Sequence, residues 1–152
     1  MSYKCQAYYV TAPKFISREA EIEFLIPDRG RGDAGPYHIK ELAIKAQSLR
    51  LVDMLIVDAM EIQYGRHRVK APDPIRFCFH KLLVSKQRTK KEKREKDRLT
   101  AFELAELLSR IPTWRQLMPD RFKELSKKHR AIVLSLLKDK DSPAVAAICS
   151  VP

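Results

Sequence analysis

The sequence contains little glycine, little cysteine and no long apolar run. It has 4 glycines in 152 residues, and none lies in a Gly-x-x-x-x-Gly-Lys or Gly-x-Gly-x-x-Gly loop, which excludes the common glycine-rich phosphate loops. Cys5, Cys78 and Cys149 are far apart and form no Cys-x-x-Cys pair, so we expect free thiols rather than a disulfide scaffold. No apolar stretch is long enough to cross a bilayer and the first residues do not resemble a secretory signal, which predicts a soluble, cytoplasmic protein with no membrane partner.

Other catalytic motifs are also absent. The chain has no His-Glu-x-x-His and no Gly-x-Ser-x-Gly, and its four histidines, His38, His67, His80 and His129, are too scattered to indicate a metal site. His80 lies beside the apolar face of a predicted helix, where a packed structural histidine is favoured over a catalytic one.

Positive charge is abundant. The formal net charge is +11 and the pI is about 9.7, which indicates an anionic partner such as a nucleotide, a nucleic acid or a membrane surface. Residues 86–98 alone carry eight basic and three acidic side chains and form either a continued helix or a break between helices, with the Glu92 and Lys96 pair favouring helix.

The order of the predicted elements indicates an α+β fold in one domain, with a strand-rich portion at 1–72 and a helical portion at 73–152. Strands are predicted within 6–16 and at 21–26, closed by Pro27. Residues 39–50 are predicted as a short helix or turn, the apolar run 54–57 as a buried strand, and 64–67 as a hairpin turn. The loop at 28–36 reads as a surface connection, with a phosphate contact through Arg29 and Arg31 as the alternative.

The stretch around which the chain is organised begins at two prolines. Asp73 occupies a helix N-cap position with Pro74 as the first helical residue. The apolar positions that follow have helical spacing and are Ile75, Cys78, Phe79, Leu82 and Leu83. We expect a further helix at 99–111, ended by Pro112, and one or two helices within 120–138. Between them we expect a short helical connection before Pro119, anchored by Trp114, Leu117 and Met118. Residues 143–152 are small and apolar.

Glu21 and Glu23 are the one arrangement that suggests a mechanism. Carboxylates at i and i+2 of a strand share a face about 7 Å apart and can serve Mg²⁺ if further oxygen ligands lie nearby. Paired acidic residues on a strand more often only increase solubility, so both interpretations stay open.

Three runs of the chain, taken in order, resemble a known family. They are Ile22-Glu23-Phe24-Leu25-Ile26-Pro27, then residues 46–55, then Val69 to Phe77 with His80-Lys81-Leu82, followed by Lys96-Asp97. This order is similar to that of bacterial proteins of the nucleotidyltransferase fold (DNA polymerase β-like) superfamily, in which the first run is commonly Val-Asp-Phe-Leu-Thr-Pro and the later one Val-Pro-x-Pro-x-Arg-Phe-x-x-His-Lys-Leu. The likeness covers roughly residues 5–110.

The resemblance implies transfer of a nucleoside monophosphate from an NTP to an acceptor, with two Mg²⁺ ions held by three carboxylates. Glu23 matches the third carboxylate, with Glu where the family commonly has Asp, so it is the expected catalytic residue; Glu21 and Glu23 are the expected metal ligands. Lys81, Lys86 and Arg88 are candidates to contact the triphosphate.

The family's Gly-Ser or Gly-Gly helix start and its Asp-x-Asp strand do not precede Glu23; the one Asp-x-Asp, Asp139-Lys140-Asp141, lies near the other end. The chain therefore resembles the latter part of such an enzyme and is expected to be catalytically incomplete by itself. Two alternatives remain: a basic nucleic-acid-binding module without catalysis, in which 86–98 follows a phosphate backbone, or an active enzyme whose missing carboxylates come from a second chain.

Overall fold

The computed structural model describes residues 14–16, 21–28 and 36–137. The chain divides into two compact units, Met1–Asp53 (unit 1) and Met54–Pro152 (unit 2). Strands and helices are both present, and the predicted α+β class is confirmed. The predictions for 6–13, for most of the 28–36 loop and for 143–152 lie outside the described residues. No described helix has the length and apolar character needed to span a membrane.

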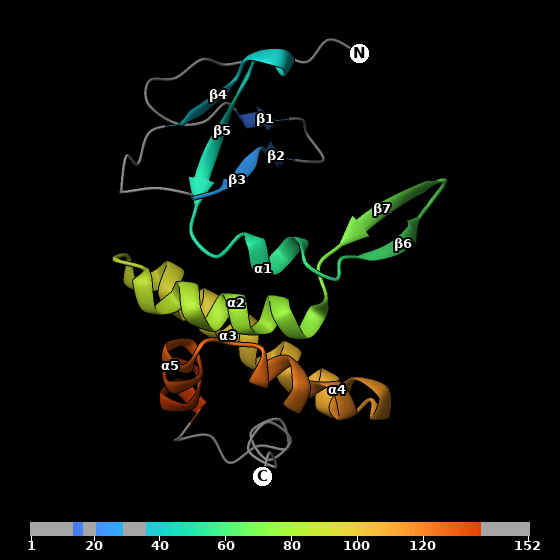
Figure 1. Cartoon of the computed structure of the whole chain (residues 1–152), viewed down its shortest axis with the longest axis vertical. Helices are drawn as coiled ribbons and strands as arrows, with labels where there is room; N and C mark the ends of the chain where they lie inside the picture. The colour runs from blue at the N-terminus through green and yellow to red at the C-terminus, as the bar shows by residue number, and fades with distance from the viewer. Residues whose placement is uncertain (1–13, 17–20, 29–35, 138–152) are drawn as a thin grey trace. The chain divides into compact units, whose positions relative to one another are not determined.

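Unit 1 is built from short strands in two small sheets (Figure 1). β1 (Lys14–Ile16) pairs antiparallel with β2 (Glu21–Glu23). β5 (Ile44–Leu49) is the central strand of the other sheet, parallel to β3 (Leu25–Pro27) and antiparallel to β4 (Tyr37–Ile39). Ala46, in the middle of β5, is fully buried.

The predicted short helix or turn at 39–50 is confirmed only at residues 40–43, and residues 44–49 form a strand instead. Only η1 (Lys40–Leu42) is helical, as a single 3-10 turn, and Ala43 then takes a positive φ of 49°. That left-handed residue reverses the chain, so that β5 returns alongside β4. The mixed periodicity of this segment reflects a strand with neighbours on both sides rather than an amphipathic helix.

The predicted strand at 21–26 exists but is interrupted. β2 and β3 are separated at Phe24, whose carbonyl accepts a 2.7 Å hydrogen bond from the Gln47 amide. The two halves pair with different partners, and Ile22 in the first half is 53% exposed. Pro27 ends β3 as expected.

Unit 2 begins with the end of a short helix, followed by a β-hairpin. The predicted buried strand at 54–57 is wrong, because this run enters the short helix α1 (Asp53–Ile56), and Ile56 and Val57 are 60% and 47% exposed. The predicted hairpin is confirmed: β6 (Met60–Tyr64) pairs with β7 (His67–Ala71) through a turn at Gly65 with φ of 58°. Most hairpin residues are exposed.

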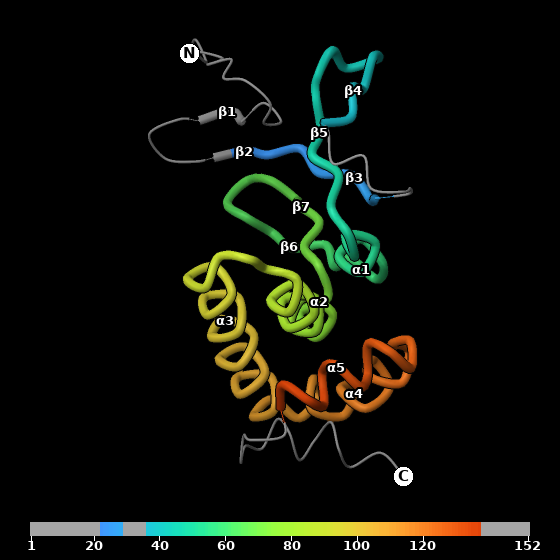
Figure 2. The backbone as a smooth tube through the Cα atoms, turned by 90° about the vertical axis from the view of Figure 1, so that its left-hand side faces the viewer, coloured from blue at the N-terminus to red at the C-terminus, as the bar shows by residue number. Residues whose placement is uncertain are grey.

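α2 (Pro74–Gln87) is the central element of unit 2. Its predicted cap is confirmed, since the Asp73 carboxylate accepts hydrogen bonds from the Ile75 and Arg76 amides at 2.9 and 3.0 Å. All five residues of the predicted apolar face are buried. α2 contacts α3 most extensively and also contacts α4 and α5, so the core of unit 2 forms around this helix (Figure 2).

The remaining helices are α3 (Lys91–Ser109), α4 (Pro112–Lys123) and α5 (Lys127–Leu137). The basic run is therefore divided by a break at 88–90. Pro112 begins α4, whereas Pro119 lies inside it instead of ending the helical connection as predicted. The missing amide of Pro119 weakens the helix locally, but Met118 and Phe122 are buried on either side of it.

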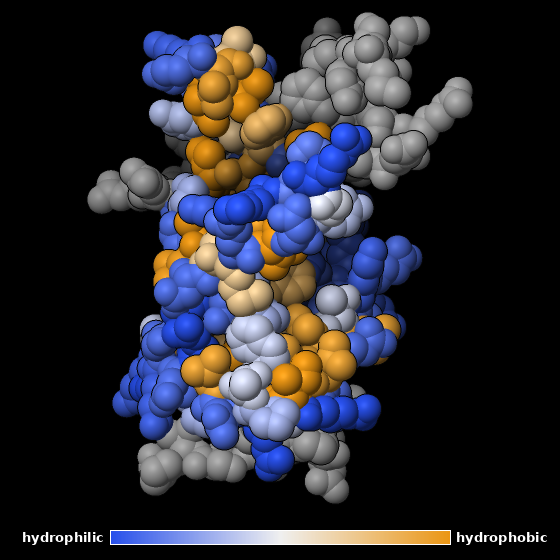
Figure 3. Space-filling model, turned by 90° about the vertical axis from the view of Figure 1, so that its right-hand side faces the viewer, coloured by the Kyte–Doolittle hydropathy of each residue, from blue (hydrophilic) through white to orange (hydrophobic). Residues whose placement is uncertain are grey.

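The core of unit 2 combines side chains from all four of its long helices. Phe79 of α2 meets Phe122 of α4 edge to face, with ring centroids 6.0 Å apart. The other buried hydrophobic residues of α3, α4, α5 and the α4–α5 connection are Ala101, Ala105, Leu108, Met118, Leu125, Val133 and Leu137. On the face shown in Figure 3, hydrophobic side chains lie in separate patches between hydrophilic ones.

Candidate functional site

β2 carries the acidic pair to which the sequence analysis assigned metal binding. In the antiparallel pairing with β1, Glu23 is opposite Lys14 and Glu21 is opposite Ile16. The two glutamates are thus two residues apart in one strand, as expected, and the side chain of Glu23 is exposed. Glu23 also takes part in polar interactions in the structure, so its carboxylate is not isolated. The assignment of Glu23 and Glu21 as metal ligands stays a prediction.

Carboxylate oxygens are the right donors for Mg²⁺, which commonly takes one or two carboxylates from a protein and completes its shell with water and substrate phosphates. Within the described ranges 14–16, 21–28 and 36–137, no three His, Cys, Asp or Glu side chains are grouped so that they could hold a metal ion. By the chemistry of their donors, Glu21 and Glu23 could supply two of the oxygen ligands of such a site, and this assignment stays a prediction.

Two of the three predicted triphosphate contacts meet at one carboxylate in unit 2. The Lys81 Nζ lies 2.8 Å from Asp97 Oδ1, and the Arg88 Nε lies 2.9 Å from Asp97 Oδ2. Asp97 is buried in α3, so these contacts join α2 and the residue after it to α3. Lys86 is exposed in the last turn of α2. Triphosphate binding by Lys81, Lys86 and Arg88 stays a prediction, and the structure shows a structural role for two of them.

The electrostatics of Asp97 follow from these contacts. Burial by itself would raise the pKa of its carboxyl, but the hydrogen bonds from Lys81 and Arg88 outweigh burial, and the pKa is lowered from its ordinary value. Asp97 is therefore ionised at neutral pH. No local pattern in the sequence indicates this arrangement, because Lys81 and Asp97 come together only when α2 and α3 pack against each other.

His80 lies next to this cluster. Its side chain is buried, and neither ring nitrogen has a hydrogen-bond partner among the residues that the structure describes. Burial, and then the charge of Lys81, lower the pKa of His80 to about 4, so the ring is neutral at pH 7. The packing is what the structural interpretation of His80 predicts.

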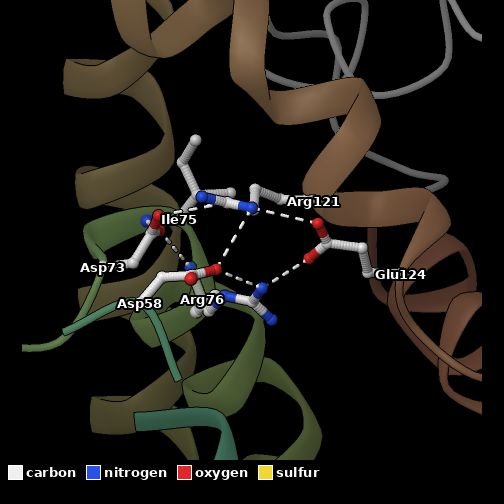
Figure 4. A network of polar contacts seen from close by, with 6 residues as sticks. All are labelled: Asp58, Asp73, Ile75, Arg76, Arg121 and Glu124. Atoms are coloured by element: carbon white, nitrogen blue, oxygen red, sulfur yellow. Dashed lines mark hydrogen bonds and ion pairs between the residues drawn. The ribbon is translucent and has the colours of Figure 1, made fainter. Parts of the chain in front are cut away.

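A second ion network joins the start of α2 to the end of α4 (Figure 4). Arg76 binds Asp58 at 2.7 Å and Glu124 at 2.6 Å. Arg121 binds Glu124 at 3.0 Å, Asp73 at 3.2 Å and Asp58 at 3.3 Å. The hydrogen bond from Arg76 holds the pKa of the Asp58 carboxyl below its usual range. Sequence reasoning missed this network, whose members lie up to 66 positions apart (Asp58 to Glu124) and share no short-range pattern.

The residues that carry the family resemblance thus have defined places in the structure. Glu23 lies in an exposed strand of a small sheet, while Arg76 and Lys81 hold α2 to its neighbours through ion pairs. An acidic strand in a two-stranded antiparallel sheet, followed along the chain by a proline-capped helix in a helical core, agrees with what the resemblance to nucleotidyltransferases implies.

Comparison with known families gives the same class. The model of a nucleotidyltransferase family matches residues 6–125, which is most of the chain. The chain belongs to this nucleotidyltransferase family. No curated protein and no solved structure matches the chain significantly.

Proposed function

We propose that this chain contributes to the transfer of a nucleoside monophosphate from an NTP to an acceptor, with Glu23 as a magnesium ligand. The observation that carries the proposal is the family match over residues 6–125 together with an exposed Glu23 in the strand where the family motif has its third carboxylate. In this reaction an acceptor oxygen forms a bond to the α-phosphorus, the bond from that phosphorus to the β-phosphate oxygen breaks, and pyrophosphate leaves as the acceptor hydroxyl loses its proton.

Magnesium ions supply charge neutralisation for the triphosphate and lower the pKa of the attacking hydroxyl. Glu23, with Glu21, would hold part of that metal site. A site of this kind needs more carboxylates than the described residues bring together, so we propose that the chain is catalytically incomplete by itself. The remaining ligands would come from a second chain or from a further segment of a longer polypeptide.

The test combines the chain with the polypeptides encoded next to it. The pure chain, alone and co-expressed with each translated upstream frame, is incubated with each α-labelled NTP and Mg²⁺ or Mn²⁺, and transfer of label is measured. We expect transfer only in the combination that carries a glycine-rich helix start and an Asp-x-Asp strand. Glu23→Gln should lower it on the order of 100-fold or more, because several kcal/mol of metal-ion stabilisation are lost.

Two further variants make the result specific. Glu23→Asp keeps the carboxylate and has the residue common in the family, so it should retain transfer. Glu61→Gln removes an exposed carboxylate of β6 that forms an ion pair with exposed Arg68 at 3.3 Å, and it should leave transfer unchanged. Transfer that persists in Glu23→Gln would overturn the role of Glu23, transfer by the chain alone would overturn its incompleteness, and the absence of transfer in every combination would overturn the function.

A further inference from the structure

The turn between α2 and α3 is surrounded by exposed lysines. Lys86 lies in the last turn of α2, Lys90 lies in the connection, and Lys91, Lys93 and Lys96 lie in the first two turns of α3. All five side chains are exposed, and none forms an ion pair with any residue in the described part of the chain. We call these five residues the lysine corner.

The carboxylates of the same segment are mostly occupied elsewhere. Asp97 is buried and bound to Lys81 and Arg88. Glu95 lies 3.6 Å from Arg94 and 3.7 Å from Arg98, so its charge is shared by two guanidinium groups. Glu92 is the remaining carboxylate among 86–98. The lysine corner therefore presents a strong local excess of positive charge to solvent, on a part of unit 2 held rigid by packing between α2 and α3.

Clustered lysines at this density repel one another unless an anion lies between them, so they indicate a polyanionic partner. Lys93 and Lys96 are one helical turn apart, about 4.5 Å along the axis of α3, which allows them to reach neighbouring phosphates. Lysine is a flexible point charge with three donors, suited to a phosphate backbone rather than to a single planar group.

The arrangement favours a nucleic acid over an anionic membrane. A helix that lies on a membrane inserts a continuous apolar face, whereas α3 buries Ala101, Ala105 and Leu108 in the core. Its exposed large apolar side chains are Leu99 and Leu107, which are eight positions apart and lie outside the lysine corner. Residues 86–98 contain no aromatic side chain on which a base could stack. The expected binding is therefore to the backbone, without sequence preference.

We propose that the lysine corner binds the phosphate backbone of a nucleic acid. The inference goes beyond the transfer reaction, because it rests on the charges of unit 2 and makes no use of Glu23. Binding of this kind releases counterions from the nucleic acid, so the logarithm of the association constant falls linearly with the logarithm of the salt concentration, by about 0.7 to 0.9 per phosphate neutralised.

The experiment measures fluorescence anisotropy of a labelled 20-nucleotide RNA and of a DNA duplex with the full-length chain, from 50 to 200 mM NaCl. The Lys93→Gln/Lys96→Gln variant should bind more weakly and reduce the magnitude of the salt slope by about 1.4 to 1.8. Lys86→Gln/Lys91→Gln should do the same. Because all four side chains are exposed and unpaired in the described structure, circular dichroism of both variants should match that of the unmodified chain.

Lys127→Gln/Lys128→Gln is the matched control, since it removes the same charge from exposed positions at the start of α5. It should keep the slope of the unmodified chain. An equal loss in this control, no binding at 50 mM NaCl, or capture by phosphatidylserine vesicles in place of nucleic acid would overturn the proposal. Glu23→Gln should bind nucleic acid normally, because Glu23 is not part of the lysine corner. Intact binding by the unmodified chain without transfer in any combination would overturn the proposed reaction alone, and transfer without nucleic-acid binding would overturn the lysine-corner proposal alone.

Discussion

At the scale of single residues, His80 is a buried titratable side chain in the core of unit 2 whose polar atoms have no hydrogen-bond partner among the described residues. It is 8% exposed. The charged groups that act on it are Lys81, Asp97 and Arg88. Burial and the two cations oppose protonation, and only Asp97 favours it. The native state therefore holds the ring in its neutral form.

His80 should make the protein unstable in mild acid. The pKa of His80 is lowered from 6.5 to about 4 in the folded chain. Between these pH values the unfolded chain binds a proton at His80 and the native state does not, so the free energy of unfolding falls as the pH falls from 6.5 towards 4. His80→Leu has a similar volume and no polar atoms, and should flatten this part of the curve while keeping stability at pH 7. Urea unfolding at a series of pH values measures it.

The other buried titrating group of this cluster does not confuse that measurement. Asp97 has a pKa below its ordinary value of 3.8, so the stability it contributes is present above that value and is lost only as the pH falls below it. An identical loss of stability between pH 6.5 and 4 in His80→Leu would show that other groups cause it.

At the scale of elements, short-range sequence patterns predicted the features of helices and turns that depend on neighbouring residues. The cap, the first proline and the apolar face of α2 were all predicted, because an N-cap and a helical period are properties of a short stretch. The run 54–57 was predicted wrongly, since four apolar residues do not distinguish a strand from a helical turn. Pro119 inside α4 was missed for a related reason: the burial of Met118 and Phe122 is a tertiary effect that overrides the helix-breaking tendency of proline.

Asp73 stabilises two elements at once, and two variants separate its contributions. Its carboxylate caps α2 and binds Arg121 of α4 at 3.2 Å. Asp73→Ala removes both interactions and should lower the free energy of unfolding by about 2 kcal/mol. Asp73→Asn keeps an oxygen for the cap and loses the charge, so it should cost about half as much. Urea unfolding at pH 7 measures both.

A surface carboxylate provides the comparison for Asp73. Asp120 is exposed and lies 3.8 Å from Lys123, so Asp120→Asn should change stability by no more than about 0.5 kcal/mol. If Asp73→Asn were as unstable as Asp73→Ala, the cap would contribute little and the ion pair with Arg121 would account for the whole effect.

At the scale of the whole molecule, the α+β class and the nucleotidyltransferase family were predicted from the order of motifs along the chain. Both depend on which strand and helix patterns follow one another in the sequence. The strand that carries Glu21 and Glu23 was also predicted. The pairing of Asp97 with Lys81 and Arg88 was not, and neither was the network around Arg76 and Arg121. Ion pairs between helices depend on how the helices cross, which no spacing in the sequence encodes.

No local pattern in the sequence marks the boundary between unit 1 and unit 2. The predicted change from a strand-rich to a helical portion at residue 72 concerns residue types within one domain and stays a prediction. The compact units divide after Asp53, and the β6–β7 hairpin lies in unit 2 with the long helices. Residue type marks the change from strands to helices, but the boundary of a compact unit depends on which side chains share a core. Among the described residues, unit 1 buries only the hydrophobic side chains Ala46 and Val52, and the other buried hydrophobic side chains are in unit 2.

Unit 2 should therefore fold by itself. The fragment 54–152 contains α2 to α5, their joint apolar core and both ion networks, so it should keep its helical circular dichroism and unfold cooperatively in urea near the midpoint of the full chain. A fragment 54–152 without cooperative unfolding would show instead that the helical core requires residues 1–53.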